Sequence, residues 1–491
     1  MEKFRDKSYV TAVLSFAASL ICALLIILTP DMDKTAGNML LIPAAAANLR
    51  LFAECGISLK QKTVDENFLP AAAAIIAAAA GSRACAAAVL AAASLTGLIK
   101  KTITIYTGQE EDETAGFRPS GKSAVTAAAA SAVLTAAAAA VAAGSQGSVP
   151  GENTVVYWLT CWSSVMSALC AVPFSAADRV RLYRAAQRAA KDGIILRSAR
   201  MLEKLSEIQT LIIEHDQIGT GKYKIADILP FSGPGEEEIR DLIGDKTPRG
   251  KNTKIALNRG EKEYTLAPPS LIKGQAEEEK TWKEAQTHCE MMKRMGRKPM
   301  IMAEDGKLRA VVSFEEYIDP NAPEAMTMIN TMGIRTVMVA RRDRLIAEAA
   351  GRRAGASEVW TVRSAAGLRE KTARMREAGE LTAAAGSDVK KVSAMGTDLT
   401  IGMGKTRGSG QADILMPDDD LLKVEKLLGD ARRISRAKRR ARVWAALYDA
   451  AAALVFSGLL FHVMGQILPP EAGPAVFILF AIISLILPFR R

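Results

Sequence analysis

Long apolar runs at both ends of the chain constrain its fold more than any other feature. Residues 9–28 contain no charged side chain, and roughly twenty such residues let one helix cross a bilayer. Less regular apolar runs predict further spans at 39–55, 123–144, 154–175, 441–464 and 472–488, and a hairpin of two helices within 68–99. The sequence therefore predicts a polytopic α-helical membrane protein with about eight spans.

The basic residues beside these runs predict the orientation of the chain. Lys or Arg flanks the spans at 2–7, 60–62, 100–101 and 490–491, whereas the loops at 30–33 and 145–153 contain neither. Because cytoplasmic loops are enriched in Lys and Arg, we expect a multi-pass protein of the plasma membrane with its large polar region in the cytoplasm. The six cysteines are few and irregularly spaced, which excludes a disulfide scaffold.

The polar region, residues 176–440, lies between the sixth and seventh predicted spans. It starts with an amphipathic helical pattern over 178–191 that ends at Gly193. It finishes with residues 432–442, which hold seven basic residues and no acidic one. A basic segment beside a membrane helix suits anionic lipid headgroups, so the lipid bilayer is the expected partner and nucleic acid is not.

Short apolar runs alternate with helical patterns inside this region. Strands are predicted at 210–213, 300–302, 310–313, 336–339 and 358–360, and helices at 322–332, 343–353 and 365–378. This alternation predicts an α/β fold with a largely parallel sheet. Residues 223–302, rich in Gly, Pro, Lys and Glu, predict an inserted lobe. The expected domains are therefore membrane helices at 1–176 and 441–491, an α/β domain at 177–222 and 303–440, and the lobe at 223–302.

Two Gly-Lys motifs do not encode a phosphate-binding loop. A Walker loop needs a Gly five positions before the Gly404-Lys405 pair, and that residue is Leu399. The second motif, Gly221-Lys222, is followed by Tyr223 where Ser or Thr is required.

Several stretches that occur in one order resemble a known family. They are Asp192-Gly-Ile-Ile-Leu-Arg-Ser-Ala-Arg-Met-Leu-Glu-Lys-Leu205, Thr210-Leu-Ile-Ile213, Met332-Gly-Ile-Arg-Thr-Val-Met338, Asp398-Leu-Thr-Ile-Gly-Met-Gly404 and Ala412-Asp-Ile-Leu-Met416. Between membrane spans, this order resembles the P-type ATPases, most closely their heavy-metal-transporting branch. The resemblance covers about residues 154–490. It implies a haloacid-dehalogenase-like phosphorylation domain with a reduced nucleotide-binding insert, cation transport, and Mg-ATP as cofactor if activity is retained.

The family's signature DKTGT supplies an Asp that attacks ATP, and this chain departs from it. The corresponding stretch is Glu214-His-Asp-Gln-Ile-Gly-Thr-Gly-Lys222. An alignment with the fewest gaps puts Glu214 in the nucleophile's place, whereas a shift of two residues restores Asp216 and matches Thr220. Both carboxylates stay candidates, with Glu214 preferred. Its extra methylene would displace the carboxylate by about 1 Å, which costs about 10²-fold in rate.

The other positions of the resembling site are also altered. Where the family has TGD, this chain has Ala340-Arg341-Arg342, which makes Arg341 and Arg342 candidate phosphate clamps. The family's phosphate-neutralising Lys falls near Leu368, with Arg369 or Lys371 as substitutes. The hinge motif GDGxNDxP is reduced to Gly386-Ser-Asp-Val389, which leaves Asp388 as the candidate Mg²⁺ ligand.

Two transport elements of the family are reduced as well. The membrane motif Cys-Pro-Cys becomes Cys170-Ala-Val172, so Cys170 is a weak metal-ligand candidate. Cys161 lies nine residues before it, on the opposite face of a helix, and does not share an ion with it unaided. The actuator domain is expected to be absent, because 100–122 is too short to form it. Within that segment Thr107-Gly-Gln-Glu110 resembles the actuator's TGE only by coincidence.

Coordinated loss at these positions predicts a pseudoenzyme. The leading hypothesis is a membrane protein on the P-type ATPase plan that no longer pumps and instead regulates a true transporter or binds another protein partner. The alternative is an active metal-cation-transporting P-type ATPase that uses Asp216 or Glu214 as an unusual phosphorylation site.

Overall fold

The chain forms two compact units. The computed structural model describes residues 7–29, 32–60, 68–107, 130–140, 154–169, 172–231, 233–248, 253–259, 262–272, 279–362, 364–407, 411–457, 469 and 471–486. The first unit, called here the helical unit, comprises Met1–Arg184 and Arg436–Arg491. The second, the α/β unit, comprises Ala185–Ser435.

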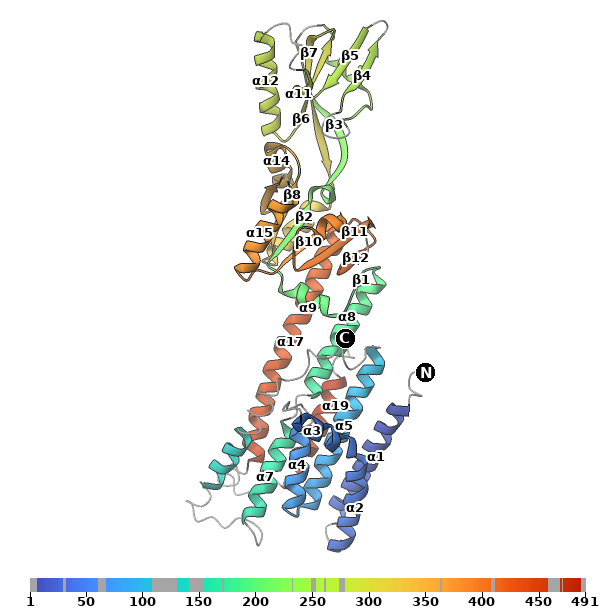
Figure 1. The fold of residues 1–491 in the computed structure, drawn as a ribbon, viewed down its shortest axis with the longest axis vertical. Helices are drawn as coiled ribbons and strands as arrows, with labels where there is room; N and C mark the ends of the chain where they lie inside the picture. The colour runs from blue at the N-terminus through green and yellow to red at the C-terminus, as the bar shows by residue number, and fades with distance from the viewer. Residues whose placement is uncertain are drawn as a thin grey trace. The chain divides into compact units, whose positions relative to one another are not determined.

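The helical unit contains apolar helices (Figure 1). In chain order its labelled helices are α1 (Lys7–Leu28), α2 (Lys34–Ala47), α3 (Leu49–Lys60), α4 (Phe68–Ala79), α5 (Arg83–Thr107), α7 (Thr154–Ala168) and α19 (Ala472–Ile486). Two longer helices, α8 (Val172–Lys191) and α17 (Leu421–Phe456), begin in one unit and end in the other. Small side chains such as Ala73, Ala77 and Cys85 fill the core, because they let helix backbones approach closely.

Among the residues described, two helices are long and apolar enough to cross a membrane. They are Tyr9–Leu28 and Arg83–Tyr106, and the pair Thr35–Ala47 and Leu49–Ile57, bent by 58°, would make a third. The predicted span at 39–55 is therefore two helices rather than one straight helix. At the bend, Asn48 Nδ2 donates to Ala44 O and Ser19 Oγ, both at 2.9 Å. The count of eight spans stays a prediction.

The other predicted spans agree with the structure to different degrees. The hairpin within 68–99 is confirmed, since α4 and α5 are joined at Gly81, whose φ is 77°. The single helix predicted at 154–175 is wrong, because α7 ends at Ala168 and α8 begins at Val172. Pro173 fits the first turn of the new helix, where its missing N–H has no intrahelical partner to lose. The run at 441–464 lies partly in α17, which also contains the whole basic segment. Residues 458–468 are outside the part described.

A seven-stranded sheet forms the centre of the α/β unit, in the order β1-β12-β11-β10-β2-β8-β9. Its strands are β1 (Ile195–Leu196), β2 (Thr210–Glu214), β8 (Arg335–Ala340), β9 (Glu358–Thr361), β10 (Thr382–Asp388), β11 (Leu399–Arg407) and β12 (Ile414–Met416). Only β1 is antiparallel to its neighbour among the described pairings, so the predicted largely parallel sheet is confirmed. The accompanying helices are α9 (Arg200–Glu207), α13 (Ala322–Thr331), α14 (Arg344–Ala354), α15 (Ala365–Glu377) and α16 (Val389–Ser393).

The inserted lobe is an antiparallel sheet in the order β3-β7-β6-β5-β4. Its elements are β3 (Gly219–Pro230), α10 (Glu236–Ile243), β4 (Ile255–Arg259), β5 (Lys262–Ala267), α11 (Pro269–Ile272), α12 (Glu279–Arg294), β6 (Lys298–Glu304) and β7 (Lys307–Ile318). The expected boundaries of 223 and 302 are therefore wrong. β7 pairs with both β3 and β6, so the strand predicted at 310–313 belongs to the lobe and not to the parallel sheet.

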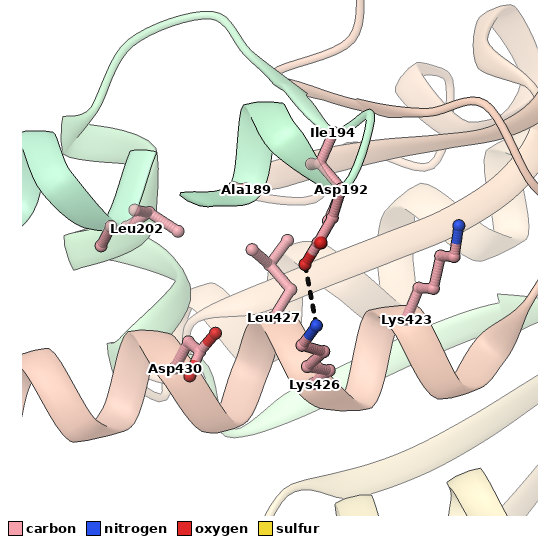
Figure 2. Close-up of a pocket in the computed structure, with 9 residues that line it drawn as sticks. Ala189, Asp192, Ile194, Leu202, Lys423, Lys426, Leu427 and Asp430 are labelled. Atoms are coloured by element: carbon pink, nitrogen blue, oxygen red, sulfur yellow. Dashed lines mark hydrogen bonds and ion pairs between the residues drawn. The ribbon is translucent and has the colours of Figure 1, made fainter. Parts of the chain in front are cut away.

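The first and last segments of the α/β unit are joined by an ion pair. Asp192, just after α8, lies 2.8 Å from Lys426 Nζ on α17 (Figure 2). The two residues line a cavity of about 130 Å³ together with apolar side chains that include Ile194, Leu202 and Leu427. Both charged groups are largely exposed, so solvent screens the attraction between them.

Candidate functional site

The carboxyl ends of β2, β8 and β10 bring most of the predicted site residues to one edge of the sheet. Parallel strands end at the same edge, which is where open α/β sheets bind ligands. β2 lies inside the sheet, between β10 and β8, and ends at Glu214, which pairs in register with Val339 of β8. β10 lies on the other side of β2 and ends at Asp388. Arg341 and Arg342 follow β8 directly.

Glu214 is buried at this edge, with an exposed fraction of 9%. Its carboxylate packs against Gly386, where an added Cβ would lie 2.6 Å from Glu214 Oε2. Burial raises the pKa of Glu214, and the nearby charges of Asp216 and Asp388 add to that effect. Lys391 and Arg341 oppose it, and the net direction is upward. The sheet edge thus holds a carboxyl group that ionises less readily than usual.

Asp216 has a different environment from Glu214. It lies in the short 3₁₀ helix η3 (His215–Gln217), and its side chain is 74% exposed. The pKa of Asp216 is lowered, chiefly by hydrogen bonding to His215. Thr220 lies in β3 of the lobe, where its hydroxyl donates to Tyr317 O at 3.0 Å. Asp216 and Thr220, which the shifted alignment would place together in the site, therefore lie in different elements: Asp216 is exposed in η3, and Thr220 is hydrogen-bonded within the lobe.

Arg342 does not project freely as a phosphate clamp would. It donates to Glu316 of β7 and to the hydroxyl of Tyr223 of β3, the latter at 3.2 Å. Glu316 is buried and also lies 3.4 Å from His215 Nε2. Burial would lower the pKa of Arg342, but the Glu316 carboxylate outweighs it and raises the pKa. We call Arg342, Glu316, Tyr223 and His215 the latch, because they join the lobe to the parallel sheet.

Asp388, the candidate Mg²⁺ ligand, is the N-cap of helix α16. Its carboxylate accepts a hydrogen bond from Lys391 N at 3.3 Å and lies 3.4 Å from Lys391 Nζ. Burial would raise the pKa of Asp388, but these bonds outweigh it and lower the pKa. Among the residues described, no group of three or more His, Cys, Asp or Glu could hold a metal ion. Asp388, the candidate Mg²⁺ ligand, is thus already paired with Lys391.

Lys391 is the cation that the sequence reasoning missed. Leu368 is buried in the core, at 3% exposure, so it is no substitute for the expected lysine. Arg369 donates to Ala394 O at 2.7 Å, and Lys371 lies over the Trp360 ring at 4.7 Å. Lys391 instead exerts the largest favourable charge effect on Glu214. Its position three residues after Asp388, at the start of a helix, was the available signal.

Three further residues of the site were also not anticipated, namely His215, Tyr223 and Glu316. Glu316 was missed because its strand was assigned to the parallel sheet. Cys170 and residues 108–110 of the TGE-like stretch lie outside the described part of the chain.

Replacing Glu214 with Gln should stabilise the chain at neutral pH. Because burial raises the folded-state pKa of Glu214, the folded protein binds more protons than the unfolded chain between the two pKa values, so stability falls as pH rises through that window. The thermal unfolding temperature of the purified chain between pH 4 and 7 should therefore fall less steeply in Glu214→Gln than in the wild type.

Asp216→Asn is the matched control for that experiment. The lowered pKa of Asp216 contributes stability that is present at neutral pH and is lost on acidification, so this variant should change the pH dependence in the opposite direction. Equal curves for Glu214→Gln and the wild type would contradict the buried, charged environment described for Glu214.

Comparisons with known proteins agree with the fold. No protein-family model matches the chain. It is 22% identical over 319 residues to "Copper-transporting ATPase 1" of Rhizobium meliloti, covering 59% of this chain and 38% of the relative. It is 24% identical over 370 residues to "Copper-exporting P-type ATPase" of Bacillus subtilis, covering 67% and 44%. The "Silver exporting P-type ATPase" of Salmonella typhimurium is 22% identical over 67% of this chain and 43% of the relative.

Solved structures share the overall architecture. A zinc-transporting PIB-type ATPase in its E2.Pi state matches with a TM-score of 0.57 at 11% identity, over 99% of this chain and 100% of that one. The same kind of protein in the E2P state gives 0.56 at 12% identity.

The fold and these relatives define a homologue of the P-type ATPases. The named relatives and structures are heavy-metal transporters, so the homologues of this chain lie in the heavy-metal-transporting branch that the resemblance predicted. The chain spans about two fifths of the length of the curated relatives, which lies between 38 and 44% for the three named.

Proposed function

We propose that this chain is a plasma-membrane, multi-pass protein on the heavy-metal P-type ATPase plan that does not form a phosphoenzyme. Its α/β unit would be a haloacid-dehalogenase-like phosphorylation domain that has become a regulatory or partner-binding module. The observation that carries the proposal is the latch. At the position where the family has the carboxylate of TGD, this chain has Arg342, which is bonded to Glu316 and Tyr223 of the lobe.

The charges at the sheet edge support the proposal. Phosphoryl transfer needs an ionised carboxylate held in line with the phosphate and a metal ion that neutralises the phosphate oxygens. Glu214 is buried with a raised pKa, which disfavours the ionised form. Asp388, the remaining hinge carboxylate, is paired with Lys391. Glu214, the candidate nucleophile, is thus less readily ionised than the family's chemistry requires, and Asp388, the candidate metal ligand, is already paired with a cation.

The test is phosphorylation of the purified full chain with γ-labelled ATP and Mg²⁺, with and without copper, silver or zinc ions. We expect no acid-stable, hydroxylamine-sensitive label above the level of a boiled sample. A catalytically competent heavy-metal ATPase run in parallel establishes that the assay detects an acyl phosphate. Label that disappears in Glu214→Gln or in Asp216→Asn would overturn the proposal.

The alternative, an active cation-transporting ATPase with an unusual site, draws support from Asp216. This carboxylate is exposed and its pKa is lowered, so it is ionised at neutral pH. The same assay separates the two proposals, because the alternative requires label that is lost in Asp216→Asn or Glu214→Gln and ATP hydrolysis that rises with metal ion.

The proposed partner is a protein, such as a true transporter, bound through the α/β unit. Exposed side chains on this unit include Tyr317 and Leu345. If the proposal holds, a partner that co-purifies with the full chain should be lost when surface residues of the α/β unit are changed and kept when the helical unit is changed. The opposite pattern would place the partner site in the helical unit.

A further inference from the structure

A cavity of about 230 Å³ lies inside the helical unit, between α1, the bent pair α2 and α3, and α5. Its polar lining differs from the small apolar side chains that fill most of this unit. The charged residues of the lining are Arg50, Glu54, Lys100 and Lys101, and the polar uncharged ones are Thr11, Ser15, Asn48, Ser94 and Thr96. Burying polar groups beside apolar spans costs free energy unless water or a charged ligand occupies the cavity.

The charges of the lining favour an anion. Glu54, its one acidic residue, is bonded to Arg50 at 2.6 Å. Arg50, Lys100 and Lys101 are the basic residues of the lining, so the lining residues themselves carry more positive than negative charge. Lys100 and Lys101 are both partly buried. A compact ammonium group suits a phosphate oxygen as a point charge.

The hydrogen bonds already made inside the cavity indicate which of its side chains can bind a ligand. Ser94 and Thr96 donate to backbone oxygens one turn away, at 2.9 and 2.7 Å, and Asn48 donates to Ser19 and Ala44. Their hydrogens are used within the protein. Each lysine ammonium group carries three N–H donors, so it can bind a ligand oxygen in addition to its contacts within the protein. A tetrahedral phosphate group accepts several such bonds at once.

The depth of the cavity points to a lipid. Thr11 lies two residues inside the span that begins at Tyr9, and Lys100 lies six residues before the end of the span at Tyr106. At 1.5 Å per residue, they are about 3 Å and 9 Å from the ends of these helices. Long lysine side chains near the ends of membrane helices extend toward the headgroup layer, so the ammonium groups of this cavity can reach lipid phosphates.

Exposed apolar side chains on the helices that form the cavity favour a lipid over a free phosphate ion. Leu14 of α1 is 62% exposed, and Leu49 and Ile57 of α3 are 69% and 57% exposed. They supply the surface that acyl chains would cover, while the cavity supplies the cations. We propose that this cavity binds the phosphate group of an anionic phospholipid, with Lys100 and Lys101 as its ligands. The proposal is independent of whether the chain forms a phosphoenzyme.

The test is retention of lipid by the full chain. The protein is reconstituted in nanodiscs of phosphatidylcholine with one tenth phosphatidylglycerol, and the lipid that stays bound after gentle detergent extraction is counted by native mass spectrometry. The wild type should retain phosphatidylglycerol in preference to phosphatidylcholine. One basic residue near the membrane surface strengthens anion binding about fivefold, so Lys100→Gln/Lys101→Gln should weaken retention by about 30-fold.

Two matched variants separate the charge of these two lysines from the positive charge of the chain in general. Lys100→Arg/Lys101→Arg keeps the charge and should keep most of the retention. Arg344→Gln/Arg374→Gln removes two positive charges that are 79% and 74% exposed on the α/β unit, outside the basic segment of α17, and should leave the retained lipid unchanged.

Three results would overturn the proposal. The first is equal retention in Lys100→Gln/Lys101→Gln and the wild type. The second is equal retention of phosphatidylcholine and phosphatidylglycerol by the wild type. The third comes from nanodiscs of phosphatidylcholine alone, to which inorganic phosphate is added. Binding of that phosphate through Lys100 and Lys101, without retention of phosphatidylglycerol, would assign the cavity to a soluble anion instead.

Discussion

Replacing Glu316 with Ala is expected to loosen the inserted lobe from the parallel sheet by about 3 kcal/mol, because removing one partner of a buried ion pair leaves the other charge uncompensated. Glu316 is 8% exposed, and Arg342 donates two hydrogen bonds to it and one to Tyr223. Without Glu316, the guanidinium of Arg342 would have to reach solvent. The paired ends of β3 and β7 would then move away from the edge of the parallel sheet.

Hydrogen exchange of the full chain measures this directly. Amides of β3 and β7 near the latch should exchange about 10²-fold faster in Glu316→Ala than in the wild type, since about 1.4 kcal/mol corresponds to a factor of ten. Amides of β4 and β5, at the far edge of the lobe's sheet, should change less.

Neighbouring residues supply the controls. Glu315, the next residue, is 26% exposed and pairs with Lys224 and Arg353. Glu315→Ala should therefore cost under about 1 kcal/mol, as more exposed pairs do. The double variant Glu316→Leu/Arg342→Met removes both charges and should recover most of the loss. If Glu316→Ala and Glu315→Ala speed exchange equally, the latch does not hold the lobe.

Replacing Gly386 with Ala is expected to destabilise the α/β unit by about 1–3 kcal/mol, the usual cost of an extra carbon in a packed site. The new Cβ would lie 2.6 Å from Glu214 Oε2 and 2.9 Å from Val392 Cγ2. The carboxylate of Glu214 would have to turn away from β10 and leave its present buried position. Thermal unfolding of the full chain, followed by circular dichroism at one pH, measures the change.

A double-mutant cycle shows whether Glu214 causes that cost. Glu214→Ala should relieve part of the Gly386→Ala destabilisation, because the clashing atoms are gone, and residues in contact give a coupling of about 0.5–3 kcal/mol. Gly367→Ala is the matched control, since a Cβ there would meet its neighbours at ordinary distances of 3.6 and 3.7 Å. Additive effects of the Gly386 and Glu214 changes would mean that the two residues are not packed together.

The two experiments together describe how the site is closed. Glu316→Ala tests the contact that holds Arg342 away from the sheet edge, and Gly386→Ala tests the packing that buries Glu214. If both effects are large and neither variant gains phosphorylation, the site has lost more than one element of the family's chemistry. A gain of label in Glu316→Ala would instead make the latch an inhibitory contact over a competent site.

Much of the α/β unit could be predicted from the sequence, because its strands and helices carry local signals. The apolar run of β2 and the patterns of α13, α14 and α15 gave boundaries correct to about one residue. β10 could not be predicted in the same way. Its residues Thr-Ala-Ala-Ala-Gly-Ser-Asp have low strand propensity, and they form a strand because β2 and β11 supply its hydrogen-bond partners on both sides.

The lobe boundary failed for a related reason. β7 is an apolar run like those of the parallel sheet, and only its pairing with β3 and β6 assigns it to the lobe. That error also hid Glu316, since a residue in a misplaced strand cannot be set against Arg342. Among the apolar helices, composition marked the runs but did not reveal the bend at Asn48, where the side chain donates hydrogen bonds to Ser19 and Ala44.

The sequence by itself determined the class of this protein: apolar runs at both ends, an α/β region between them, and ordered stretches that resemble heavy-metal P-type ATPases. It also determined which residue types stand at the altered positions, because identity at an aligned position needs no coordinates. The tertiary structure decided what those residues do. Arg342 became a contact of the lobe, Lys391 became the cation beside Glu214, and Asp388 became a helix cap, because each role depends on strands and helices that meet only when the sheet is formed.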